Sequence, residues 1–206
     1  METIEVGIDS NSMMERPLKK DQRPIVFYGT SITQGGCASR PGMVHTNIIS
    51  RKLDIDVINF GFSGNGKMEQ PINELISEMN PLFYVIECLP NMKAAEITQR
   101  TIPLVKTIQK KRPETPIIFV ENFLYESIVL DKKRETQIKD KNAALKTEYN
   151  KMRAGGYKNI FYISSEQATG EDHEGTVDGV HFTDLGFIRY ADFLMDKFVQ
   201  LGLISE

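Results

Sequence analysis

The chain has 206 residues, the length of one ordinary α/β domain, and it can bury a continuous core without disulfides or a metal. Its 25 lysines and arginines against 28 aspartates and glutamates give a formal charge of -3, without the basic excess of proteins that bind nucleic acid or anionic membranes. Two cysteines without a CxxC pair argue against a disulfide framework and a structural zinc site.

Residues 1–23 differ from the rest of the chain. Ile4, Val6 and Ile8 alternate as in a strand, and a polar linker follows. We expect an N-terminal extension or the remnant of an upstream β domain here, with a single domain over 24–206. The N-terminus has no apolar stretch long enough for a signal peptide, and no run of about 18 apolar residues occurs in the chain. The chain as it stands is therefore expected to be cytoplasmic, or exported if a leader has been removed.

Five short apolar runs are the strand candidates. They cover residues 24–29, 56–60, 82–88, 116–120 and 159–163. Their apolar residues are mostly continuous rather than alternating, which is typical of parallel strands that are covered on both faces.

Longer segments of helical period separate these strands, at residues 42–52, 70–78, 94–111 and 131–152, with a last one at 184–201. In 94–111, Ile97, Leu104 and Ile108 form one apolar face, whereas the charge run of 131–152 is interpreted as a solvated face. The alternation predicts an α/β fold, a three-layer α/β/α sandwich on a flavodoxin-like, five-stranded parallel sheet. A functional site should then lie at the carboxyl ends of the strands.

Polar clusters follow three strands and precede the last helix. Ser31 lies in "GTSITQGG", Gly64 in "FSGNG", Asn91 in "LPNM", and Asp178 and His181 in "TVDGVHF". Acyl transfer needs a nucleophile, a base, a group that orients the base, and donors for the oxyanion. Ser31, His181 and Asp178 can fill the first three roles, because Asp-x-x-His presents both side chains from one turn. The backbone N–H groups of Ser31 and Gly64 and the Asn91 amide would form the oxyanion hole.

These four blocks, in this order, resemble those of the SGNH hydrolases, which include the GDSL esterases and lipases. The resemblance spans residues 25 to about 200 and implies that 24–206 is a catalytic domain with a Ser-His-Asp triad, needing no metal or organic cofactor. The wording "FYGTSITQGGCASRPGM", "NFGFSGNG" and "ECLPNM" resembles a branch that often carries a β-rich domain ahead of the catalytic one.

The chain departs from the family pattern at two of the blocks. Thr30 stands where an Asp usually precedes the serine, and Leu89-Pro90-Asn91-Met92 replaces the usual Gly-x-Asn-Asp. The serine and the asparagine of the pattern are kept. The chain also lacks the G-x-S-x-G turn of α/β-hydrolases, which disfavours that fold.

Other polar residues receive simpler interpretations. His45 is expected to be a partly buried helix residue, and His173 a solvated loop residue. Three scattered histidines predict no metal site, and Cys37 is assigned a structural role. Arg40 follows the nucleophile loop closely, so we predict that it contacts the substrate.

Three functions fit the sequence. The first is a serine esterase that cleaves small acyl esters, acetyl above all, on a small molecule or a carbohydrate. Small acyl groups are favoured because no long apolar lid segment is visible and 122–130 is the one apolar loop expected beside the site. The second is an acyltransferase with the same triad. The third is a flavodoxin-like module that binds a phosphate or nucleotide through "GTSITQGG". Possible partners besides the ester are an upstream β domain or further copies of the chain.

Overall fold

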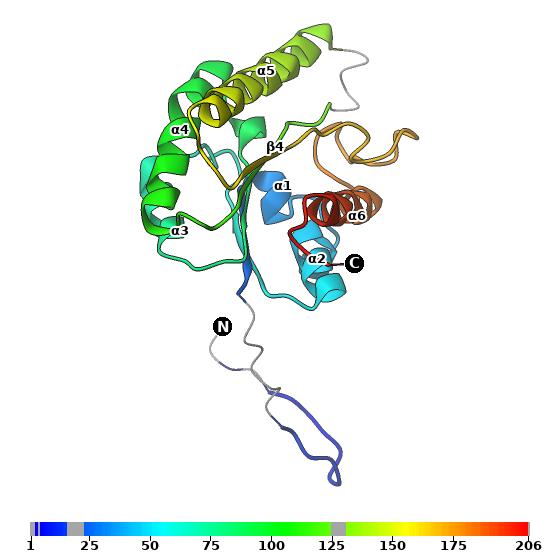
Figure 1. Cartoon of the computed structure of the whole chain (residues 1–206). Coiled ribbons are helices and arrows are strands. Elements are labelled where there is room, and N and C mark those ends of the chain that lie inside the picture. Colours follow the sequence, from blue (N-terminus) through cyan, green and yellow to red (C-terminus); the bar gives the residue numbers. More distant parts are fainter. Residues whose placement is uncertain (1–2, 4, 16–22, 125–130, 206) are drawn as a thin grey trace.

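The computed structural model describes residues 3, 5–15, 23–124 and 131–205. Five parallel strands form one sheet in the order β2-β1-β3-β4-β5, which is the flavodoxin-like order (Figure 1). They are β1 Ile25–Gly29, β2 Val57–Gly61, β3 Tyr84–Glu87, β4 Ile117–Val120 and β5 Ile160–Ile163. The predicted fold class is confirmed, and each predicted strand is present with slightly different ends.

Helices cover both faces of this sheet. They are α1 Ser31–Gln34, α2 His45–Leu53, α3 Gln70–Ser77, α4 Ala94–Lys111, α5 Lys132–Ala154 and α6 Asp184–Gln200, with 3₁₀ turns η1 Pro41–Met43 and η2 Leu89–Asn91. Figure 1 shows α3, α4 and α5 on one side and α1, α2 and α6 on the other. None of the helices in the described residues is long and apolar enough to cross a bilayer.

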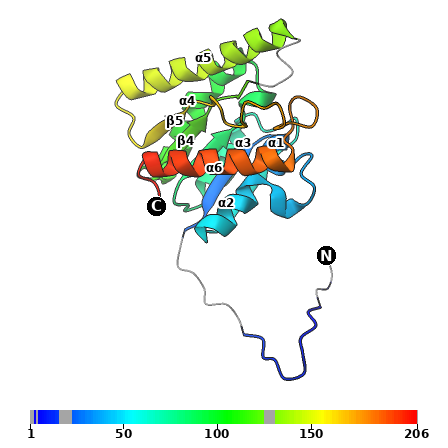
Figure 2. The same cartoon turned by 90° about the vertical axis from the view of Figure 1, so that its right-hand side faces the viewer.

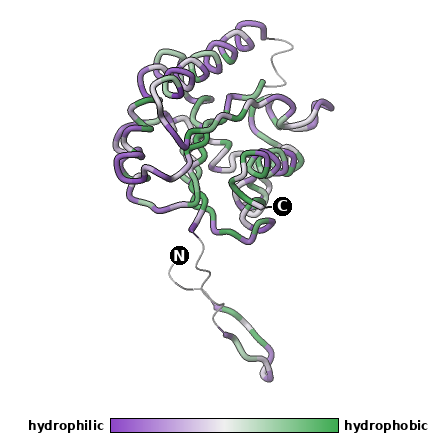
Figure 3. Tube along the Cα trace, in the orientation of Figure 1, coloured by the Kyte–Doolittle hydropathy of each residue, from purple (hydrophilic) through white to green (hydrophobic). Residues whose placement is uncertain are grey.

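The core consists of two layers, one on each face of the sheet. Ile25 and Phe27 of β1 pack into the layer under α2 and α6, whereas Val26 and Tyr28 pack into the layer under α3 and α4. Successive residues of a strand point to opposite faces, so both sets must be apolar. Figure 3 shows this as a hydrophobic band along the sheet. The predicted apolar face of α4 is buried in the second layer.

Residues 5–15 lie away from the sheet in both views (Figures 1 and 2). They contain no strand, and Ser12 N donates to Asp9 O at 2.9 Å in a turn. The side chains of Val6 and Ile8 are exposed, and Ile4 lies outside the described residues. That this segment belongs to an upstream β domain stays a prediction.

The loops after β1 and β2 approach each other closely enough to require glycine. A Cβ atom on Gly66 would lie 1.8 Å from the carbonyl oxygen of Gly29, and one on Gly61 would lie 2.1 Å from Gln34 N. Phe62 N donates to Gly29 O at 3.1 Å across the same junction. The absence of side chains therefore allows the "FSGNG" loop to lie against the loop that carries Ser31.

Candidate active site

Ser31 is the first residue of α1 and directly follows β1 through Thr30. Thr30 is the N-cap of this helix, and its hydroxyl accepts from Ile32 N at 3.3 Å. Thr33 Oγ1 accepts in return from Thr30 N at 3.2 Å, so the two threonines form a reciprocal capping box. Their hydroxyls hold the loop in shape, and Ser31 Oγ is left to face His181.

Ser31, His181 and Asp178 form a continuous chain of contacts. Ser31 Oγ lies 2.9 Å from His181 Nε2, and His181 Nδ1 lies 2.7 Å from Asp178 Oδ2. The other carboxylate oxygen, Oδ1, accepts from the backbone N–H groups of Val180 at 2.9 Å and His181 at 2.7 Å. One short turn thus fixes both the aspartate and the histidine, as the Asp-x-x-His spacing predicted.

The electrostatics of this turn keep Asp178 ionised. Burial opposes the charged form, but hydrogen bonds from the His181 ring, from His181 N and from Val180 N together lower the pKa of Asp178 to about 2. A carboxylate at Nδ1 favours the imidazole tautomer whose proton is on Nδ1. Nε2 then presents its lone pair to the Ser31 hydroxyl and can act as a base.

The predicted oxyanion donors line the same cleft as Ser31 and His181. This cleft has a volume of about 400 Å³, and both Gly64 and Asn91 form part of its wall. Gly64 has φ +71°, a left-handed conformation that glycine adopts without strain. Asn91 Nδ2 donates to Phe62 O at 3.2 Å, which orients the amide and leaves its second N–H for another acceptor.

One wall of the cleft was not predicted from the sequence. It is formed by four residues of α5, namely Arg134, Gln137, Ile138 and Lys141. The charge run of 131–152 was interpreted as a solvated face, and the structure adds that one side of this helix also lines the cleft. These positions follow the spacing i, i+3, i+4 and i+7, which places them on one side of the helix, but the spacing does not tell which part of the protein that side faces.

Four other predicted assignments can be placed. Arg40 is absent from the described residues that line the cleft; its Nη1 donates to Ser39 Oγ at 3.1 Å and lies 3.9 Å from Asp184. Its contact with a substrate stays a prediction. His45 is fully buried rather than partly buried, and His173 is exposed. Cys37 is exposed and Cys88 buried, both as free thiols.

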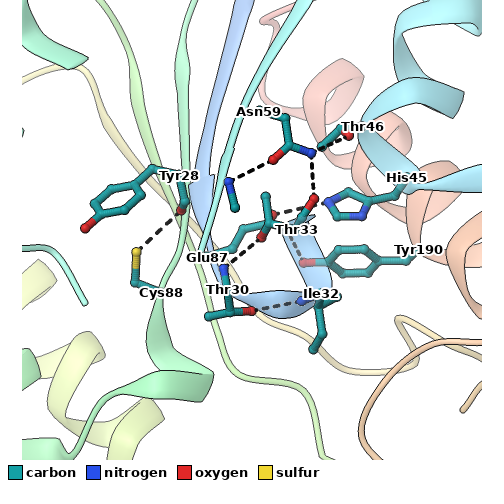
Figure 4. Close-up of polar contacts among 11 residues, drawn as sticks. Tyr28, Thr30, Ile32, Thr33, His45, Thr46, Asn59, Glu87, Cys88 and Tyr190 are labelled. Atoms are coloured by element: carbon teal, nitrogen blue, oxygen red, sulfur yellow. Dashed lines mark hydrogen bonds and ion pairs between the residues drawn. The ribbon is translucent and has the colours of Figure 1, made fainter. Parts of the chain in front are cut away.

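A buried polar network lies under the nucleophile loop (Figure 4). The Glu87 carboxyl group at the end of β3 contacts Tyr190 Oη at 2.6 Å, Thr33 Oγ1 at 3.0 Å and His45 Nε2 at 3.2 Å. Burial, followed by the nearby Glu87, raises the pKa of Tyr190 well above its usual range, so its hydroxyl remains a donor. The network connects β3, α2 and α6 with α1, the helix that begins at Ser31.

A family profile and a solved structure both relate this chain to the same family. The profile of the GDSL-like Lipase/Acylhydrolase family matches residues 22–199. A crystal structure from Bacteroides ovatus, of a protein assigned to the GDSL-like lipases, superimposes with a TM-score of 0.85 at 38% identity and covers 87% of this chain. This chain spans 53% of that protein, about half its length. A comparison with curated proteins finds no match.

More distant structures share the fold. A salicylyl-acyltransferase from a tetracycline biosynthetic pathway has a TM-score of 0.75 at 18% identity, covering 90% of this chain and 57% of its own. A two-domain esterase active on acetylated mannans has a TM-score of 0.64 at 19% identity, covering 90% and 50%.

Proposed function

This chain belongs to the GDSL-like lipase/acylhydrolase family, and we propose that it is a serine esterase that hydrolyses small acyl esters through Ser31, His181 and Asp178. The observation that carries the proposal is the pair of contacts that joins Ser31 Oγ to His181 at 2.9 Å and His181 to Asp178 at 2.7 Å. A nucleophile, a base and an orienting carboxylate at these distances match the requirements of acyl transfer.

The proposed reaction has two halves. Ser31 Oγ attacks the ester carbonyl while His181 Nε2 takes its proton, and the backbone N–H groups of Ser31 and Gly64 with the Asn91 amide stabilise the oxyanion. Collapse of this intermediate breaks the bond to the alcohol, which receives the proton from His181, and leaves an acyl-enzyme. Water then attacks the acyl-enzyme by the same steps and regenerates the Ser31 hydroxyl.

For the substrate, we propose a small acyl group, acetyl above all, on a polar alcohol such as a carbohydrate. Among the described lining residues, aliphatic side chains come from Ile32, Ile138 and Val180, with Pro90 beside them, which offers little apolar surface for a long acyl chain. The apolar loop 122–130, expected beside the site, lies mostly outside the described residues. Esterases on acetylated mannans share the fold and support a carbohydrate.

A second candidate is acyl transfer to an acceptor other than water. The salicylyl-acyltransferase with the same fold supports it, because the acyl-enzyme is common to both reactions. The third function, a phosphate-binding module, is disfavoured because the hydroxyls of Thr30 and Thr33 already form hydrogen bonds within the chain. Product analysis with added alcohol acceptors separates transfer from hydrolysis.

The experiment that tests the triad compares wild type, Ser31→Ala and Ser63→Ala with a fluorophosphonate probe and p-nitrophenyl acetate. Ser63 lines the same cleft, so its variant controls for general effects on the pocket. We expect Ser31→Ala to lose labelling and about 10³-fold or more of kcat, while Ser63→Ala still reacts with the probe. Equal labelling and hydrolysis of wild type and Ser31→Ala would refute the proposal.

A further inference from the structure

The described residues that line the active-site cleft carry net positive charge, although the whole chain carries -3. Among the described residues that line it, the side chains with a permanent charge are Arg134 and Lys141, and none is an aspartate or glutamate. Asp178 is not among these lining residues, and its carboxylate is hydrogen-bonded to the ring of His181. By contrast, the larger cavity beside Phe123 is lined by Lys139 together with two glutamates.

Lys141 is a half-buried cation whose ammonium group donates a hydrogen bond to a neutral acceptor. Its Nζ donates to the carbonyl oxygen of Pro90 at 3.0 Å, and within the described parts of the chain no carboxylate forms an ion pair with it. Other lysines of α5 differ, since Lys132, Lys139 and Lys151 each pair with a glutamate of the same helix. An ammonium group has three N–H donors, so Lys141 retains capacity for an anion.

The surroundings of Lys141 disfavour its charge when the cleft holds no anion. Burial lowers its pKa, the nearby Arg134 lowers it further, and only Glu96 acts in the opposite direction. Glu96 itself pairs with Arg100 at 3.5 Å. A negative charge placed beside Lys141 would favour the charged form of its ammonium group.

Lys141 also lies close to the predicted reaction centre. Its hydrogen bond to Pro90 holds the ammonium group against η2. Asn91, the proposed oxyanion donor, follows Pro90 in the same turn. A small ester with its carbonyl at Asn91 would therefore reach Lys141 with a second group of its own. The Lys141 ammonium group is therefore placed to bind a substituent of the substrate.

We propose that the preferred esters of this cleft carry a carboxylate, that Lys141 Nζ binds it, and that Arg134 on the same face of α5 adds to the attraction. This inference rests on the proposed esterase function and names the class of its substrate. Lys141 is then a specificity-determining residue. Either half of the ester can carry the carboxylate, so two pairs of substrates are needed.

The test uses esters that differ in charge and little else. Mono-4-nitrophenyl glutarate and 4-nitrophenyl pentanoate differ at the acyl end, whereas 4-acetoxybenzoate and 4-acetoxybenzamide differ in the alcohol. The variants are Lys141→Met, Lys141→Arg and, as a matched control on the opposite side of α5, Lys139→Met. The quantity compared is the ratio of kcat/KM for the charged over the neutral member of each pair.

We expect wild type to favour the carboxylate in at least one pair, and Lys141→Met to lower that ratio about tenfold or more. Lys141→Arg should restore part of the ratio, Lys139→Met should keep it, and added salt should reduce the wild-type preference. A ratio near one in both pairs for wild type would overturn the proposal. So would an equal loss on charged and neutral esters in Lys141→Met, because Lys141 would then act on the oxyanion or the loop.

A binding measurement separates this inference from the proposed function. Titration of the products glutarate and 4-hydroxybenzoate into Ser31→Ala, with and without Lys141→Met, follows carboxylate binding without any turnover. Binding of one of them that depends on Lys141 supports the inference even if no ester is hydrolysed. Hydrolysis that depends on Ser31, with neither a charge preference nor such binding, refutes the inference and leaves the esterase function standing.

Discussion

Tyr190→Phe removes one hydroxyl from the buried network beneath the nucleophile loop. Tyr190 is 3% exposed, and its hydroxyl donates at 2.6 Å to Glu87 Oε1. Thr33 and His45 contact the other oxygen, Oε2. A hydroxyl donates to each of the two Glu87 oxygens, which is the arrangement expected of an acceptor carboxylate, so the substitution leaves a buried oxygen without its donor.

The expected cost follows from the charge of the acceptor. A hydrogen bond to a charged group contributes about 1.5–3 kcal/mol to the free energy of unfolding. For a chain of this length, each kcal/mol changes Tm by about 2–4 °C, so Tm should fall by roughly 3–12 °C. The phenylalanine ring keeps the contacts with His45 and Phe182, which confines the change to the hydroxyl.

Tyr84→Phe is the matched control. Tyr84 is also fully buried, and its hydroxyl lies near two neutral acceptors, Ile76 O at 3.1 Å and Met79 O at 3.2 Å. Its loss should cost about 0.5–1.5 kcal/mol. Urea unfolding followed by circular dichroism gives both free energies. If Tyr190→Phe destabilises the chain no more than Tyr84→Phe, then Glu87 does not act as a charged acceptor and the interpretation of the network fails.

Two further predictions concern the triad. Asp178→Asn should lower kcat for p-nitrophenyl acetate by about 10²–10⁴-fold with KM changed only a few-fold, because Asp178 orients the imidazole and stabilises its charge in the transition state; a loss below about fivefold would contradict that role. The acidic side of the pH profile of kcat/KM should show one limb, in which activity falls as the imidazole of His181 gains a proton. Asp178, with a pKa of about 2, stays ionised along this limb, and a profile without an acidic limb would contradict His181 as the base.

The fold could be predicted because its sequence signals are local. A buried parallel strand needs apolar residues on both faces, and an amphipathic helix such as α4 needs them on one. The short elements were missed because they carry no such local signal. The turns α1 and η2 contain four and three residues, too few to show a period, and they are fixed by caps and neighbouring loops.

The site was predictable only where short motifs carry it. Ser31 and the pair Asp178 and His181 lie in recognisable blocks, and the structure brings their side chains together. The wall formed by α5 depends on how that helix is placed against η2, which no local pattern specifies. Glu87 was hidden inside a strand prediction, although a charged residue in a buried strand is itself a sign of a hydrogen-bonded network.

The departures from the family pattern show which parts of the blocks determine geometry. Thr30, in place of the usual Asp, still caps α1 with its hydroxyl and so keeps Ser31 at the first position of the helix. Met92 replaces a polar residue and is buried in the core. Pro90 is the second residue of η2 and offers its carbonyl to Lys141. These substitutions keep Ser31 and Asn91 in the cleft and change what surrounds them, so differences in substrate should originate in the wall of Pro90 and α5 rather than in the triad.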